Sequence, residues 1–112
     1  MGRACVVDIP RGVDVQFTQV IEFRTSDIGA FTAALDEWLA STGTERAATR
    51  AILCEDRDEP GRWVQVVEFP SYEAAMANSN DPRTTEFAQR LSSMCDEGPT
   101  FRNLDLHETY QM

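Results

Sequence analysis

The chain has 112 residues, 42% of them hydrophobic, which suits one small globular domain. Its formal net charge of −9, with 19 acidic and 10 basic residues and no basic stripe, argues against nucleic acid and anionic membranes as partners. No apolar run approaches the roughly 18 residues of a membrane-spanning helix, and the N-terminus lacks a signal-peptide core. Three widely spaced cysteines (Cys5, Cys54 and Cys95) form neither a metal-binding pattern nor a disulfide framework, so we expect a cytoplasmic protein without a metal.

The first half of the chain predicts an arm, a strand and a helix. Residues 1–14 are irregular, because Pro and Gly interrupt their apolar residues, and we expect an N-terminal arm there. Residues 15–24 alternate between apolar and polar side chains, which is typical of a β-strand. Ser26 or Asp27 caps a helix that Gly43 ends. One apolar stripe on this helix is expected to face the core: Ile28, Phe31, Leu35, Trp38 and Leu39.

The second half predicts a hairpin, a broken helix and a last strand. Strands at residues 47–56 and 62–69 are joined by a turn with Pro60 and Gly61 at its centre, the signature of a type II turn. Ser71 caps a second helix, which breaks before Pro82 because proline suits the first turn of a new segment. This segment has one apolar face: Phe87, Ala88, Leu91 and Met94. Gly98-Pro99 is expected to end the segment, before a fourth strand at residues 100–108.

The order is therefore β-α-β-β-α-β in a single domain over residues 15–112. Two pentapeptides within it nearly repeat, since residues 19–23 read QVIEF and residues 65–69 read QVVEF. Each precedes a capped helix and then a strand that begins with arginine, either Arg50 or Arg102. Aligning these arginines puts two pairs in register, and we expect all four apolar side chains to lie under the helices: Ile52 with Leu104, and Cys54 with Leu106. The other face of the fourth strand then carries Phe101, Asn103, Asp105 and His107.

One stretch resembles a known family. Residues 66–75 (VVEFPSYEAA), residues 79–82 (SNDP) and Phe87 are similar to a strand, a Ser-x-Glu-Ala helix start, a broken helix and a late Phe or His of the dimeric α/β barrel superfamily, which includes antibiotic biosynthesis monooxygenases. The resemblance covers about residues 15–108. It implies a ferredoxin-like α+β fold with an antiparallel sheet, in which two sheets pack face to face in a homodimer and each protomer keeps a pocket. Two helices cover only one sheet face, so the other apolar face needs a partner.

The resemblance also implies a range of activities: cofactor-free oxygenation of aromatic polyketides or quinols, haem degradation, isomerisation and cyclisation. The positions that match the haem-ligating His, the Trp and the pocket Asn of haem degraders are Phe87, Asn78 and Gln19. Two of these three lack the necessary chemistry, so no cofactor is expected. We expect a small cofactor-independent monooxygenase that acts on an aromatic or polyketide-like molecule. The alternatives are a non-catalytic dimer that binds a small apolar ligand or a protein partner, and a cyclase or isomerase.

His107 is the single histidine of the chain and the predicted general base. Asp105 lies two residues before it and Asn103 four, hence on the same face of the strand. A carboxylate beside an imidazole raises the pKa of the imidazole and orients the ring, so Asp105 is the predicted orienting residue. The alternative is that this stretch is only a polar strand edge. Replacing His107 with Ala is expected to abolish turnover while leaving the dimer folded.

Polar contacts and aromatic walls complete the predicted substrate site: Gln19, Gln65, Asn103, Trp63, Phe69, Tyr72 and Asn78. The two glutamines either bind a ligand or bond each other across neighbouring strands, since a buried amide needs partners. Trp63 and Phe69 either stack on a planar ligand or belong to the core. Tyr72 and Asn78 lie near the helix break, where capping by neighbouring residues is the competing explanation.

Overall fold

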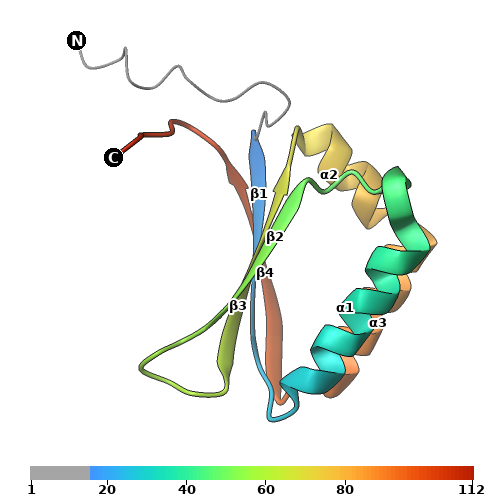
Figure 1. The fold of residues 1–112 in the computed structure, drawn as a ribbon, viewed down its shortest axis with the longest axis vertical. Coiled ribbons are helices and arrows are strands. Elements are labelled where there is room, and N and C mark those ends of the chain that lie inside the picture. The colour runs from blue at the N-terminus through green and yellow to red at the C-terminus, as the bar shows by residue number, and fades with distance from the viewer. Residues whose placement is uncertain (1–15) are drawn as a thin grey trace.

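The computed structural model describes residues 16–112, so the arm expected over residues 1–14 and Cys5 lie outside the described residues. The elements follow in this order: β1 (Phe17–Arg24), α1 (Ile28–Thr42), a 3₁₀ turn η2 (Gly43–Glu45), β2 (Arg50–Glu55), β3 (Arg62–Phe69), α2 (Tyr72–Ser79), α3 (Pro82–Met94) and β4 (Glu97–Asp105). The expected β-α-β-β-α-β order is confirmed, with the second helix divided into α2 and α3 (Figure 1).

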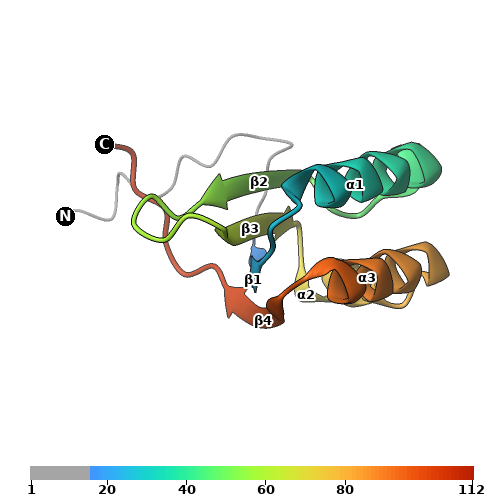
Figure 2. The ribbon, with the colours of Figure 1, turned by 90° about the horizontal axis from the view of Figure 1, so that it is seen from below.

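The four strands form one antiparallel sheet in the order β2-β3-β1-β4. Helices α1 and α3 lie side by side against one face of this sheet, as Figures 1 and 2 show from two directions. The opposite face, called the open face below, has no helix over it in the described part of the chain. This is the ferredoxin-like α+β arrangement that the sequence predicts. No helix of residues 16–112 is both long and apolar enough to cross a membrane.

The helix ends follow the capping signals of the sequence. The side chain of Asp27 caps α1, and Gly43 with φ +53° ends it, because a left-handed backbone conformation has little steric cost at glycine. Ser71 caps α2 in the same way as Asp27 caps α1. Asp81 caps α3, and Pro82 occupies its first position, where a missing N–H removes no helical hydrogen bond. The predicted boundary residues at these helix ends therefore have their expected roles.

The hairpin between β2 and β3 also forms as the sequence predicts. The N–H of Arg62 donates a 3.1 Å hydrogen bond to the carbonyl of Glu59, which closes a four-residue turn around Pro60 and Gly61. Gly61 has φ +94°, the backbone conformation that the third position of a type II turn requires.

The fourth strand begins earlier than expected. The sequence predicts a strand at residues 100–108 after Gly98-Pro99, but β4 spans Glu97–Asp105 and contains both residues. The register of β4 against β1 shifts between Glu22 and Arg24, opposite this point. Gly98 has φ +86°, and a Cβ there would lie 2.9 Å from the carbonyl oxygen of Glu22. Glycine therefore permits a bulge that continues the strand, rather than a stop before it.

The core lies between the sheet and the helices in two clusters. The first is built on Ile21, Phe23, Phe31 and Leu91, and the second on Phe17, Phe69 and Ala75. Burying one such phenylalanine or leucine contributes roughly 1.5–3 kcal/mol relative to leaving it exposed. Since residues 17, 21 and 23 are all buried, the odd-numbered side chains of β1 face the helices.

The predicted faces of β2 and β4 were wrong. Ile52, Leu104 and Leu106 do not lie under the helices; they are 37%, 46% and 37% exposed, and Cys54 is exposed as well. The residues aligned through the repeat do share a face, but it is the open one. The reason is the strand register. It places Ile52 opposite Val66 and Leu104 opposite Thr18, which both lie on the open face, whereas Ala51 and Leu53 of β2 face the helices.

Candidate ligand pocket between the sheet and the helices

A pocket of about 330 Å³ lies between the sheet and the helices, where the two core clusters meet. Small-molecule sites typically measure roughly 300–1,000 Å³, so this one suits a compact ligand. Most of its lining is aliphatic or aromatic: Ile21, Leu35, Trp38, Leu39, Ala48, Ala51, Val67, Phe69, Phe87, Ala88, Leu91 and Phe101. The remaining lining residues are polar or charged: Gln19, Arg46, Thr49, Arg50, Gln65, Asn78 and Thr84.

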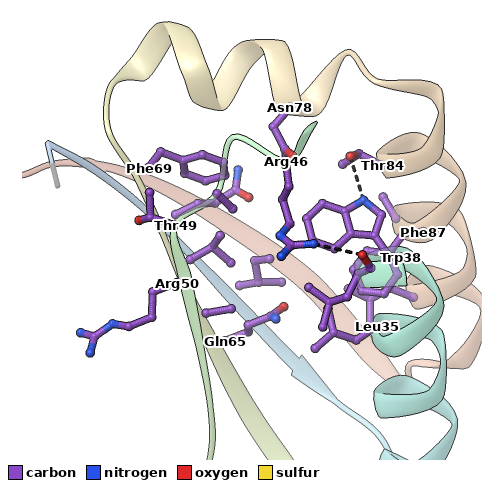
Figure 3. Close-up of a pocket in the computed structure, with 18 of the residues that line it drawn as sticks. Leu35, Trp38, Arg46, Thr49, Arg50, Gln65, Phe69, Asn78, Thr84 and Phe87 are labelled. Atoms are coloured by element: carbon purple, nitrogen blue, oxygen red, sulfur yellow. Dashed lines mark hydrogen bonds between the residues drawn. The ribbon is translucent and has the colours of Figure 1, made fainter. Parts of the chain in front are cut away.

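Trp38 forms one aromatic wall of the pocket rather than part of a filled core. Its indole N–H donates a 3.0 Å hydrogen bond to the hydroxyl of Thr84 on α3 (Figure 3). Its ring lies 6.1 Å from that of Phe87, at an interplanar angle of 32°. A half-buried indole with its N–H satisfied presents an apolar face, which is suited to stacking on a planar ligand.

Arg46 extends across the pocket beside Trp38 (Figure 3). Its guanidinium carbon lies 5.9 Å from the centre of the indole ring, within the range of a cation–π contact. Its Nη1 donates to the carbonyl of Leu39 at 3.0 Å and to the hydroxyl of Thr42 at 3.2 Å, which satisfies acceptors at the end of α1. Arg46 is therefore held in place by the helix end and by the indole ring.

Gln65 places an amide in the pocket without a partner. The residue is only 2% exposed, and its amide makes no hydrogen bond within residues 16–112. No fully buried side-chain nitrogen or oxygen in that range lacks a partner, so the Gln65 amide is in contact with the open space of the cavity. Figure 3 shows the amide directed from β3 toward Leu35 on α1. Buried polar groups are normally hydrogen-bonded, so an amide that faces a cavity is suited to a ligand atom or a bound water. The two glutamines do not bond each other, because Gln19 donates instead to Asn103.

Arg50 lines the pocket at its edge, but its guanidinium is engaged elsewhere. It points away from the cavity and forms two hydrogen bonds of 3.1 and 3.0 Å with the carboxylate of Glu68 (Figure 3). The cation that reaches into the pocket is therefore Arg46. Among the pocket-lining residues of the described chain there is no Asp, Glu, His, Cys or Tyr. Within the same span no group of three His, Cys, Asp or Glu residues is placed to hold a metal ion.

The wall formed by α1 and α3 is tied together outside the pocket. Arg83 donates a 2.7 Å hydrogen bond to the carbonyl of Ser41 and forms ion pairs with Asp81 at 2.7 Å and Glu45 at 3.0 Å. The hydrogen bonds from Arg83 lower the pKa of the Asp81 carboxyl from 3.8 to about 2. These contacts join the start of α3 to the end of α1, the helices that carry Thr84 and Trp38.

Four of the residues predicted for the site line this pocket: Gln19, Gln65, Phe69 and Asn78. Trp63 packs against the first core cluster, and Tyr72 is 52% exposed with its ring edge on Phe17. Asn103 contacts the site only through its bond to Gln19. Asp105 ends β4, and His107 follows the strand; both are exposed, and neither lines the pocket of its own chain.

Two prominent pocket residues, Trp38 and Arg46, were not predicted as site residues. Trp38 falls on the apolar stripe of α1, a pattern that does not distinguish a core residue from a cavity wall. Arg46 follows the helix stop in an irregular segment without a motif. At Phe87, which matches the haem-ligating position of the haem degraders, the ring is an apolar wall with no lone pair for iron.

No family model matches this chain, and no curated protein does. Solved structures do match. SnoaB, a cofactor-independent oxygenase from Streptomyces nogalater, has a TM-score of 0.71 at 16% identity, over 85% of this chain and 96% of SnoaB. An antibiotic biosynthesis monooxygenase has a TM-score of 0.65 at 16% identity, over 81% and 98% of the two chains. A protein from Shewanella oneidensis has a TM-score of 0.66 at 21% identity, over 83% and 92%. The chain therefore has the ferredoxin-like α+β fold of the antibiotic biosynthesis monooxygenases.

Proposed function

We propose that the protein is a cofactor-independent monooxygenase that oxidises a planar aromatic or polyketide-like molecule bound in the pocket. The observation that carries the proposal is the composition of the pocket, in which the rings of Trp38, Phe69 and Phe87 line the same cavity as the unpartnered amide of Gln65. Aromatic walls favour a flat ligand, and a single amide fixes its orientation. That SnoaB, a cofactor-independent oxygenase, shares the fold supports this choice of reaction.

The proposed reaction needs no external reductant. A substrate with an acidic methylene between aromatic rings loses a proton, and its anion transfers one electron to dioxygen. The two radicals combine to a peroxide, and loss of water leaves a ketone. In sum, R₂CH₂ and O₂ give R₂C=O and H₂O. One oxygen atom enters the product, the other leaves as water, and the four electrons come from the substrate carbon.

The proposed proton acceptor remains His107, oriented by Asp105. Both residues are exposed at the end of β4 and lie outside the pocket of their own chain. The role therefore requires that a second copy of the chain bring this strand end to the pocket.

We further propose that the protein is a homodimer joined through the open face of the sheet. This face carries a set of apolar side chains, of which Leu104 is 46% exposed and Ile52 37%: Val20, Ile52, Val64, Val66, Leu104 and Leu106. Contiguous exposed apolar side chains on a sheet are typical of an interaction surface. The cytoplasm is the proposed compartment, because the odd number of cysteines fits reducing conditions.

A second candidate is a binding protein that performs no chemistry. It is favoured by the absence of a titratable proton acceptor among the pocket-lining residues within residues 16–112. Such a protein would bind the same planar molecules and release them unchanged. Measuring dioxygen consumption separates the two candidates.

The test is dioxygen uptake by the purified, metal-free protein with a panel of anthrones and hydroquinones. Ala88→Leu fills the pocket from α3, while Ala77→Leu adds the same atoms at an exposed position on α2 outside it. We expect uptake by the wild type and by Ala77→Leu, with a loss of roughly tenfold or more in Ala88→Leu, since even one extra methylene in a hydrophobic pocket changes specificity by about that amount. Absence of uptake with every compound would favour the binding protein.

A further inference from the structure

We propose that the ligand of this pocket carries an acidic hydroxyl group on its ring system and binds as the anion, with the guanidinium of Arg46 as the residue that selects it. This inference rests on the proposed function and names the class of substrate for the same pocket: a phenol or enol conjugated with an aromatic system. Arg46 acts here as a specificity-determining residue rather than as a proton acceptor.

Arg46 has N–H donors that no residue in the range 16–112 uses. A guanidinium has five N–H donors in a planar fork. In this structure Nη1 donates hydrogen bonds to the carbonyl of Leu39 and to the hydroxyl of Thr42, whereas Nε and Nη2 make no hydrogen bond to any residue in the range 16–112. A purely structural role at the end of α1 accounts for one nitrogen only. The other two are available to a ligand that lies against Trp38.

The positive charge of Arg46 is not compensated by a carboxylate among the described residues. The chain has a net charge of −9, and six of its other arginines form ion pairs with carboxylates: Arg24, Arg50, Arg62, Arg83, Arg90 and Arg102. Arg46 forms none with the described residues, although it lines a cavity. An uncompensated cation beside an apolar cavity favours an anion there, because a half-buried charge pair is screened less than an exposed one.

Two opposing effects act on the pKa of a hydroxyl group bound in this pocket. An apolar pocket alone raises the pKa of a bound phenol, because burial disfavours its charged form. A neighbouring guanidinium lowers it, because an opposite charge favours the phenolate. The proposal requires the second effect to exceed the first.

The test uses a dye that cannot be turned over. 2-Hydroxyanthraquinone is flat, already fully oxidised, and changes its visible spectrum on deprotonation; 2-methoxyanthraquinone has nearly the same shape and cannot ionise. We expect the wild-type protein to lower the pKa of the bound hydroxy dye by about one unit, and to bind its anion about tenfold more tightly than the methoxy dye. A bound dye with a raised pKa would overturn the proposal without any variant, and so would a failure of the wild type to bind either dye.

Variants then assign the effect to Arg46. Arg46→Gln keeps an N–H donor for the helix end and removes the charge, Arg46→Lys keeps the charge, and Arg57→Gln removes a charge from the exposed hairpin, outside the pocket. We expect Arg46→Gln to abolish the preference for the anion while its affinity for the methoxy dye stays within about twofold. Arg46→Lys and Arg57→Gln should keep the preference. Full anion preference in a folded Arg46→Gln variant would overturn the proposal.

Failure of this inference and failure of the proposed function give different results. Dye binding that depends on Arg46, without dioxygen uptake, supports the ligand class and removes the oxygenase. If the wild type takes up dioxygen but the preference for the dye anion is the same in Arg46→Gln, the proposed ligand class is rejected and the oxygenase reaction is retained.

Discussion

The amide of Gln19 donates a 3.1 Å hydrogen bond to the amide oxygen of Asn103 across β1 and β4. Gln65, which has the same place in the repeated pentapeptide, lies between Ile21 and Leu53 on the neighbouring strands. Ile21 and Leu53 are aliphatic, so neither can donate a hydrogen bond to the Gln65 amide or accept one from it. Two equivalent glutamines on one sheet face therefore differ in what they offer, since Gln19 joins two strands and Gln65 is left for a ligand.

Replacing Gln65 and Gln19 in turn should separate these roles. We expect Gln65→Leu to weaken binding of 2-methoxyanthraquinone about tenfold, because the ligand loses a hydrogen-bond partner in the pocket. Its free energy of unfolding should stay unchanged or rise by up to about 1 kcal/mol, since no bond within the described chain is lost. Gln19→Leu should lower the free energy of unfolding by about 1 kcal/mol and change binding less. Dye titration and urea unfolding measure both quantities; undiminished affinity in Gln65→Leu would contradict the assignment.

His107→Ala tests the proposed proton acceptor separately from binding. 2-Methoxyanthraquinone has no acidic proton for His107 to accept, so the variant should bind this dye with wild-type affinity. Its rate of dioxygen uptake should fall by roughly 10²-fold or more, the usual contribution of a general base. Asp105→Asn should reduce the rate less, since it removes only the orienting charge. Uptake at the full wild-type rate by His107→Ala would remove His107 from the mechanism.

Local signals in the sequence were enough for the fold. A cap such as Asp27 or Ser71, a stop such as Gly43 and the Pro60-Gly61 turn each act within a few residues, so their geometry is written in adjacent positions. The repeat also placed Gln19 and Gln65 on one face correctly. It did not identify which face of β2 and β4 the helices cover.

The errors concern contacts between distant segments. Arg50 and Arg102 do align, but both point to the open face, where they pair with Glu68 and Glu22. Because the open face also carries apolar residues, hydrophobicity alone does not distinguish it from the core face. Likewise, the position of Arg46 over Trp38 depends on how an irregular segment returns to the end of α1, and no local pattern encodes that return. The sequence therefore identified only some of the residues that line the pocket.

The proposed dimer can be tested through the exposed thiol on the open face. Cys54 is exposed, whereas burial, with a smaller effect of Asp96, raises the pKa of the half-buried Cys95 thiol, so in a single chain Cys54 should react first with a thiol reagent. If the open faces meet, the reaction of Cys54 in a Cys5→Ser background should slow as protein concentration rises. Leu104→Arg should restore fast labelling and give a monomer by analytical ultracentrifugation. A monomeric wild type at all concentrations would remove the dimer.

The ion pair between Asp81 and Arg83 predicts a specific dependence of stability on pH. Its hydrogen bonds lower the pKa of the Asp81 carboxyl from 3.8 to about 2, so the folded state favours the carboxylate more than the unfolded state does. The stabilisation is therefore fully present above about pH 4 and is lost as the pH falls through about 2. Asp81→Asn keeps an oxygen to cap α3 but removes the charge. Its melting temperature should lie below that of the wild type at pH 6, and the difference should narrow between pH 4 and pH 2.

Two comparisons make this result specific. Salt should also narrow the difference at pH 6, because both partners are partly exposed and screened by solvent. Asp27→Asn is the matched control, since Asp27 caps α1 in the same way but forms no ion pair within residues 16–112. At pH 6, added salt should change the effect of Asp27→Asn on the melting temperature less than that of Asp81→Asn, because Asp27 has no ion pair for salt to screen. An undiminished effect of Asp81→Asn at pH 2 would show that the carboxylate acts through its capping geometry alone, and that its charge does not help to hold α3 against α1.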